Sequence, residues 1–140
     1  MIKRYTRPEM GRIWSDENKF RTWLRVEIAA TGTLAEAGLV PKKAADAIRR
    51  KGDFDLERIT QIEDEVKHDV IAFTTAVAEK VGPASRWFHF GLTSNDVVDT
   101  AQALQVQEAS ALIRHETLER KICGSSLMAT CVSPLAQRDC

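Results

Sequence analysis

Long hydrophobic runs and a charge excess of either sign are both absent from this sequence. No 18 consecutive apolar residues occur, so no segment is expected to span a membrane. The 20 basic and 20 acidic residues give a formal net charge of zero, which argues against non-specific binding to nucleic acid. No apolar segment follows the charges of residues 1–5, so we expect no secretory leader and a cytoplasmic location.

Cysteine is also scarce, and its spacing is not that of a metal site. The three cysteines, Cys123, Cys131 and Cys140, lie eight and nine residues apart, which fits no zinc-binding or redox template. We expect unpaired thiols in a reducing compartment. The sequence therefore predicts no bound metal.

Strand signals are missing as well, because pairs such as Val97-Val98 are short and no hairpin dipeptide flanks them. Helical periodicity takes their place and predicts an all-α fold with four helices, over residues 16–37, 41–51, 56–81 and 93–123. In the first helix one stripe recurs at three- and four-residue steps, formed by Phe20, Trp23, Leu24, Ile28, Thr31, Leu34 and Ala35.

Residues suited to capping stand at the ends of these helices. Ser15 and Asp55 are good N-caps, and Thr93 with Asp96 resembles a capping box at the start of the fourth helix. That helix contains no Gly or Pro up to Cys123, so it would span roughly 40 Å at about 1.5 Å per residue. This length predicts an extended bundle whose other helices come from later in the chain or from other subunits. The preceding helices end at glycines, namely Gly38, Gly52 and Gly82.

The composition changes near the C-terminus. Only Lys121, Arg138 and Asp139 are charged among the last 20 residues, whereas the first 120 residues hold the other 37 charges. Helical periodicity also fails after about Ile122, where Gly124-Ser125-Ser126 interrupts it. We therefore divide the chain into an N-terminal helical domain (1–92), the start of a central helical bundle (93–122) and an aberrant tail (123–140).

The first segment that could carry chemistry leads into the fourth helix. Unpaired backbone N–H groups and the helix dipole favour an anion there. Thr93 and Ser94 add hydroxyl donors, and His89 can add a proton or a positive charge. These groups describe a pocket for a carboxylate or phosphate. The alternative, favoured from spacing alone, is that Thr93 only caps the helix and His89 is an ordinary surface residue.

A second segment, Lys67-His68-Asp69, falls within the third predicted helix. Consecutive helical residues point about 100° apart, so the three would not share one face. His68 lies off the centre of the apolar stripe, where it could be a general acid or base or a satisfied structural histidine. Asp69 could orient a histidine or hold a ligand hydroxyl, and Lys67 could simply be solvated.

The third segment is Arg4-Tyr5, before the first helix. An arginine followed by an aromatic residue can clamp a phosphate, with a bidentate guanidinium and a ring stacked on a base. The alternative is a frayed terminus with ordinary surface residues.

Together these segments resemble the adenylosuccinate lyase family. Residues Arg4–Met10 resemble its N-terminal motif, Glu65–Phe73 its second and Phe88–Thr100 its third, in order and with natural spacing up to about Arg120. The third motif is shared in outline by the wider fumarase/aspartase superfamily. The first two point to the adenylosuccinate branch.

The resemblance implies a lyase with an all-α fold that acts on a nucleotide substrate. The family eliminates fumarate from adenylosuccinate to give AMP, and cleaves the succinyl-carboxamide ribotide in the same way. It needs no metal or organic cofactor, and it forms homotetramers whose active sites combine residues of several subunits. The resemblance implies that Arg4 and Tyr5 contact the nucleotide and that Lys67, His68 and Asp69 line the substrate site. Thr93 and Ser94 would bind the succinyl carboxylate, and His89 would lie near the phosphoryl end. His68 would also assist proton transfer or orient the acid.

The family's main general-acid histidine and its serine loop have no counterpart in this chain. The tail segment Gly124–Met128 is similar to the start of that loop, but Ala129-Thr130 stands where the loop has Pro-x-Lys, and we interpret the likeness as chance. We therefore expect an incomplete and inactive fragment, arising from a frameshift, a mis-assembled gene or a truncation, that self-associates. The alternatives are another superfamily lyase, such as argininosuccinate lyase or a muconate cycloisomerase, and a non-catalytic module that binds a partner helix.

Overall fold

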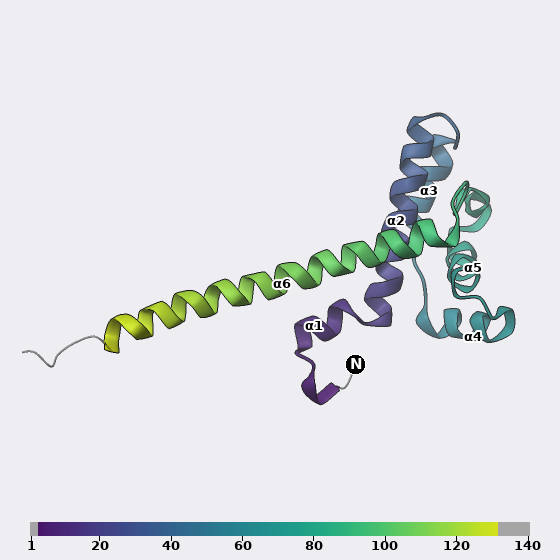
Figure 1. Ribbon diagram of the computed structural model, residues 1–140. Helices are drawn as coiled ribbons and strands as arrows, with labels where there is room; N and C mark the ends of the chain where they lie inside the picture. The colour runs from purple at the N-terminus through teal and green to yellow at the C-terminus, as the bar shows by residue number, and fades with distance from the viewer. Residues whose placement is uncertain (1–2, 132–140) are drawn as a thin grey trace, which may run out of the picture.

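The computed structural model describes the backbone of residues 3–131 and the side chains of residues 4–118. Within this part of the chain all regular structure is helical, so the all-α prediction is confirmed (Figure 1). The elements, with η marking a 3-10 helix, are η1 (Lys3–Tyr5), α1 (Pro8–Ile13), α2 (Asp16–Glu36), α3 (Lys42–Lys51), α4 (Leu56–Val66), α5 (Asp69–Val81), η2 (Gly82–Trp87) and α6 (Ser94–Cys131).

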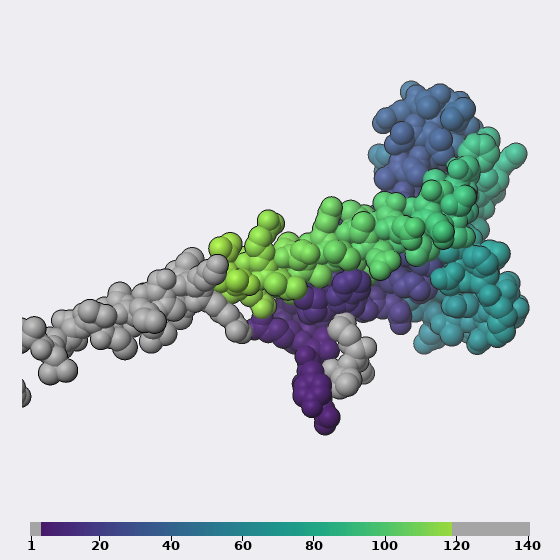
Figure 2. Space-filling model, in the orientation of Figure 1, coloured from purple at the N-terminus to yellow at the C-terminus, as the bar shows by residue number. Residues whose placement is uncertain are grey.

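The long helix α6 organises the molecule. It begins beside the cluster of shorter helices, crosses α2 and then extends well beyond them (Figure 1). The N-terminal segment that includes α1 lies against the lower side of α6 in the same orientation (Figure 2). The predicted long helix is therefore present as α6, and its C-terminal part extends beyond the other helices.

Aromatic rings form the centre of the core. Phe73 of α5 is completely buried, and replacing it with alanine would cost about 3–5 kcal/mol of stability. Because one of its neighbours, Phe88, follows η2 directly, the core anchors the loop that leads to α6. Four rings have their centroids 5.5–6.2 Å from that of Phe73: Phe20, Trp23, Phe54 and Phe88.

The first predicted helix is confirmed as α2. The Ser15 hydroxyl caps it by accepting a hydrogen bond from the Asn18 N–H at 3.2 Å. Gly38 follows its C-terminus with φ of 77°, a backbone conformation that favours glycine. Five members of the predicted stripe are buried, while Ile28 and Leu34 are half-buried. The buried five are Phe20, Trp23, Leu24, Thr31 and Ala35.

The third predicted helix is wrong in one respect, because it is two helices. α4 ends at Val66, Lys67 adopts a left-handed conformation with φ of 51°, and His68 is extended. The break lets α5 fold back against α4, so that both helices bury an apolar face in the same core. A continuous helix would carry these faces away from each other. Val66, the last residue of α4, is 41% exposed.

Two further differences concern glycines. Gly52 ends α3 as predicted, but in an extended conformation; a Cβ there would lie 2.6 Å from the carbonyl oxygen of Ile48. In the fourth helix, the predicted interruption at Gly124-Ser125-Ser126 is wrong, because the backbone of α6 remains helical to Cys131. The division of the chain into three domains stays a prediction, and Cys140 lies outside the described residues.

Candidate functional site

The start of α6 is organised by the predicted capping box, which the structure confirms. Asp96 Oδ2 accepts hydrogen bonds from the Thr93 N–H at 2.7 Å and the Thr93 hydroxyl at 2.8 Å. In return the Thr93 hydroxyl accepts one from the Asp96 N–H at 3.4 Å. The bond from the Thr93 N–H, followed by that from its side chain, holds the pKa of Asp96 below its ordinary value. Asp96 therefore remains an anion at this helix end.

The capping box changes what Thr93 can offer a ligand. The Thr93 hydroxyl donates its hydrogen to Asp96, so this hydrogen serves the helix cap and is not available to a ligand. Ser94, half-buried in the first turn, has no side-chain hydrogen-bond partner within the described chain. The donors left at this helix start are therefore the Ser94 hydroxyl and the first-turn N–H groups other than that of Asp96, which donates to Thr93.

His89 is hydrogen-bonded to Glu27, a residue that was not among the predicted site residues. Glu27 of α2 is completely buried, and its Oε1 lies 2.5 Å from His89 Nδ1. Its Oε2 accepts a hydrogen bond from the His89 N–H at 3.1 Å. Burial raises the pKa of Glu27 above its ordinary value, and the hydrogen bonds and charge of His89 oppose this rise. The position could have been found, because Glu27 lies four residues after Trp23 and four before Thr31, inside the apolar stripe.

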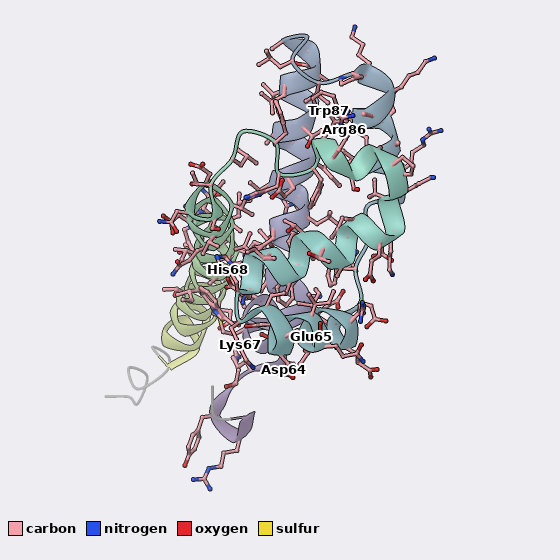
Figure 3. The ribbon with its side chains drawn as sticks, turned by 90° about the vertical axis from the view of Figure 1, so that its right-hand side faces the viewer. Asp64, Glu65, Lys67, His68, Arg86 and Trp87 are labelled. Atoms are coloured by element: carbon pink, nitrogen blue, oxygen red, sulfur yellow. The ribbon has the colours of Figure 1, made fainter. Side chains whose placement is uncertain are left out.

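His68 lies at the junction of α4 and α5 and caps α5 (Figure 3). Its Nδ1 accepts a hydrogen bond from the Ile71 N–H at 3.3 Å. The adjacent Asp69 places Oδ1 3.7 Å from the same Nδ1 and accepts a bond from the Val70 N–H. His68 is thus partly exposed, with Nε2 as the ring nitrogen left for a ligand.

Lys67 faces acidic rather than anion-binding surroundings. Its Nζ lies 3.7 Å from Asp64 Oδ1, and both side chains are largely exposed. Figure 3 shows Lys67, Asp64 and Glu65 near one another at the end of α4. The cavity beside Lys67 has a volume of about 330 Å³ and is lined by Thr60, Glu63, Asp64 and Lys67. This lining contains two acidic residues and one basic residue.

Arg4 and Tyr5 lie in η1, at the opposite end of the N-terminal region from the start of α6 (Figure 1). The Arg4 guanidinium carbon is 4.8 Å from the centroid of the Tyr5 ring, and Tyr5 is 74% exposed. The described part of one chain therefore groups His89, Thr93 and Ser94 but does not bring Arg4 and Tyr5 to them. The binding roles of all eight predicted residues stay predictions.

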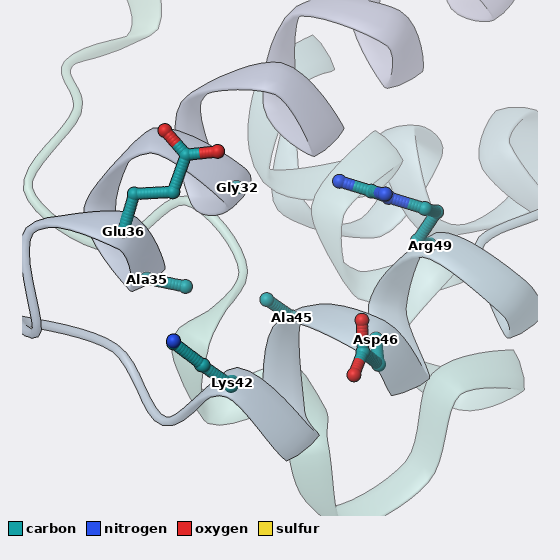
Figure 4. Close-up of a pocket in the computed structure, with 7 residues that line it drawn as sticks. All are labelled: Gly32, Ala35, Glu36, Lys42, Ala45, Asp46 and Arg49. Carbon is teal, nitrogen blue, oxygen red and sulfur yellow. The ribbon is translucent and has the colours of Figure 1, made fainter.

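A separate pocket lies between α2 and α3 (Figure 4). Its volume is about 170 Å³, and it is open to solvent. Two acids and two bases among its lining residues leave no net charge to select a ligand, and none of the lining residues is a predicted site residue. They are Gly32, Ala35, Glu36, Lys42, Ala45, Asp46 and Arg49.

No group of three or more His, Cys, Asp or Glu side chains among the described residues could hold a metal ion. No helix within residues 3–131 combines the length and apolar character that crossing a membrane requires.

The chain is similar in sequence to adenylosuccinate lyases and in fold to a solved muconate lactonizing enzyme. It is 54% identical over 116 residues to adenylosuccinate lyase from Streptococcus mutans, covering 83% of this chain and 27% of the relative. It is 55% identical over 122 residues to adenylosuccinate lyase from Synechocystis, covering 87% and 28%. Among solved structures, 3-carboxy-cis,cis-muconate lactonizing enzyme from Pseudomonas putida superposes with a TM-score of 0.72 at 31% identity, covering 78% and 26%.

The fold is therefore that of an all-helical lyase of the fumarase superfamily. The lyase family matches residues 3–129, and the chain belongs to that family. This match continues past Arg120, where the motif resemblance was expected to end. The chain spans a little over a quarter of the length of the curated relatives it matches.

Proposed function

We propose that this chain carries the N-terminal portion of an adenylosuccinate lyase. The reaction is the elimination of fumarate from adenylosuccinate to give AMP, with the same cleavage of the succinyl-carboxamide ribotide. The observation that carries the proposal is the identity of 54–55% to adenylosuccinate lyases, compared with 31% to the muconate-lactonizing enzyme of the same fold. That difference favours the adenylosuccinate branch over the other superfamily lyases.

His68 would assist the proton transfers of this reaction. In the elimination, a base removes the proton next to a carboxylate, and a general acid protonates the departing nitrogen. Because His68 Nδ1 accepts a hydrogen bond, the neutral ring carries its hydrogen on Nε2. His68 can therefore donate a hydrogen bond from Nε2 to the departing nitrogen, or orient the acid that protonates it.

The start of α6 would bind the succinyl carboxylate. Ser94 and the first-turn N–H groups are donors, and the helix dipole adds about 0.3–1 kcal/mol for an anion. Arg4 and Tyr5 would contact the nucleotide, and Lys67 and Asp69 would line the site. Because Arg4 and Tyr5 lie in η1, away from the start of α6 within one chain, the proposal includes a homotetramer whose sites combine several subunits. The proposed reaction uses no metal or organic cofactor.

The 140-residue chain by itself is expected to be inactive, because it contains neither the main acid histidine nor the serine loop of the family. Pure chain should leave the absorbance of adenylosuccinate unchanged and should bind AMP in a calorimetric titration. Adding the Synechocystis relative without its matching N-terminal region should restore turnover. Turnover by the chain alone would contradict the expected inactivity, and failure of both AMP binding and complementation would remove the lyase assignment.

One variant pair links the site to this assay. Ser94→Ala should lower fumarate binding and the turnover measured after adding the shortened relative, because it removes a hydroxyl donor at the helix start. Ser110→Ala, on an exposed position further along α6, is the matched control. Equal effects of the two variants would argue against a carboxylate site at Ser94.

A further inference from the structure

We propose that Glu27 is a positioning residue that holds His89 through both carboxyl oxygens and keeps a hydrogen on His89 Nε2. That atom then acts as a hydrogen-bond donor to an anionic oxygen of the ligand. The inference rests on the proposed function only for the nature of that ligand, the phosphoryl end of a nucleotide. The protonation of His89 itself is a property of the free chain and can be tested without any ligand.

The geometry gives Glu27 two separate holds on one residue. Oε1 is 2.5 Å from the ring Nδ1, and Oε2 is 3.1 Å from the backbone nitrogen of the same His89. The backbone bond supports a residue whose φ of 58° lies in the left-handed region, which non-glycine residues rarely adopt. Ring and backbone are therefore fixed together by one side chain from a different helix.

Burial decides where the hydrogens lie. A fully ionised Glu27 facing a neutral His89 would leave a net negative charge at a carboxyl that is completely buried, which is strongly unfavourable. Asp96 of α6, which interacts electrostatically with His89, is negative and adds to this cost. A neutral pair avoids it: the carboxyl hydrogen on Oε1 is donated to Nδ1, and the carbonyl Oε2 accepts the backbone N–H. The raised pKa of Glu27 likewise favours the protonated carboxyl.

This arrangement leaves Nε2 as the ring nitrogen that carries hydrogen. The His89 side chain is 25% exposed, and within the described residues Nε2 has no hydrogen-bond partner. It belongs to the loop that leads into the Thr93 cap, so a ligand at the start of α6 comes near it. A carboxylate behind an imidazole more often accepts the Nδ1 hydrogen and leaves Nε2 as a base. The two arrangements predict opposite roles for His89.

The direct test is 15N NMR of the histidine rings in the free wild-type chain at pH 7. Only three histidines are present, and single substitutions of His68 and His115 assign the spectrum. We expect a protonated, pyrrole-type signal from His89 Nε2. A pyridine-type signal from that atom would overturn the proposal whether or not the chain binds nucleotides.

Two variants of Glu27 then separate positioning from simple packing. Glu27→Gln keeps one donor and one acceptor, so it should preserve the Nε2 hydrogen and bind inorganic phosphate and AMP within about threefold of wild type. Glu27→Leu fills the space without either group and should lose the tautomer preference and bind these probes about tenfold more weakly. Glu108→Gln and Glu108→Leu, at a partly exposed carboxyl, are the matched controls.

The outcomes distinguish this inference from the proposed function. If the wild-type Nε2 is protonated but the chain binds neither AMP nor phosphate, the assigned ligand is wrong and the positioning stands. If the Glu27→Gln spectrum loses the Nε2 hydrogen, the carboxyl is not the donor to Nδ1, and the proposal fails even where AMP binds.

Discussion

Gln105 of α6 and Ile13 of α1 are joined by a buried hydrogen bond, in which the Gln105 Nε2 donates to the Ile13 carbonyl oxygen at 2.7 Å. Gln105 is 6% exposed and lies midway between the buried Ala101 and Ala109 on one face of α6. An ion pair between Arg7, which directly precedes α1, and Glu116 of α6 makes a second contact with the same helix. These contacts set the place of the segment that leads to Arg4 and Tyr5.

The first prediction concerns this attachment. Gln105→Leu should lower the free energy of unfolding by about 1 kcal/mol, because the Ile13 carbonyl retains only the bond from Asn18. Urea denaturation followed by circular dichroism measures the change. Gln107→Leu, an exposed position on α6, is the control and should stay within about 0.5 kcal/mol of wild type. Equal effects would mean that the buried bond adds nothing.

A second prediction follows from the raised pKa of Glu27, caused mainly by burial. An acid whose pKa is higher in the folded chain binds more protons there than in the unfolded chain. Its contribution to stability therefore falls as the pH rises from about 4.5 through the raised value. Glu27→Gln removes this group, so its stability relative to wild type should grow over that interval. Thermal unfolding at several pH values, with Glu108→Gln in parallel, tests this; a difference independent of pH would contradict it.

The left-handed residue between α4 and α5 gives a third prediction. Lys67→Gly should raise the free energy of unfolding by about 0.5–1 kcal/mol, because glycine adopts a φ of 51° without steric cost. Gln102→Gly, in the exposed interior of α6, should instead cost about 1 kcal/mol. Denaturation of both variants decides the matter, and destabilisation by Lys67→Gly would show that the side chain is needed at the junction.

The fourth prediction concerns self-association through α6. Val106, Ile113 and Leu118 are each about half exposed on this helix, and burial of such a side chain contributes about 1.5–3 kcal/mol. Sedimentation velocity should show concentration-dependent oligomers, and Ile113→Glu should weaken them at least tenfold. Gln107→Glu introduces the same charge at a polar exposed position and should have a smaller effect. A monodisperse wild-type monomer would contradict the prediction.

The helix starts were predictable because a cap acts within three residues. Ser15 accepts from Asn18, and Thr93 exchanges bonds with Asp96, so the residues that make each contact stand together in the sequence. The break at Lys67 was missed because its local periodicity is that of one helix. What favours the break is the burial of α4 and α5 in a common core, which involves residues from α2 and η2 as well.

For the buried polar residues, the sequence shows which positions are unusual but not which residues they contact. Glu27 and Gln105 each occupy a core position of an apolar stripe, so the pattern marks them as unusual. Their partners cannot be read from that pattern. Glu27 binds His89, 62 positions away, and Gln105 binds Ile13, 92 positions away. The periodicity of a sequence predicts which face of a helix is buried but not which other helix packs against that face.

The sequence by itself determined the helical class, the caps at Ser15 and Thr93, and the motifs that align the chain with lyases, because these depend on neighbouring residues. Only the tertiary structure decided that α4 and α5 are separate helices, that Glu27 contacts His89, and that Arg4 and Tyr5 lie apart from the start of α6. Those outcomes depend on which apolar faces meet and on what burial does to a charge, and both are set by contacts between distant parts of the chain.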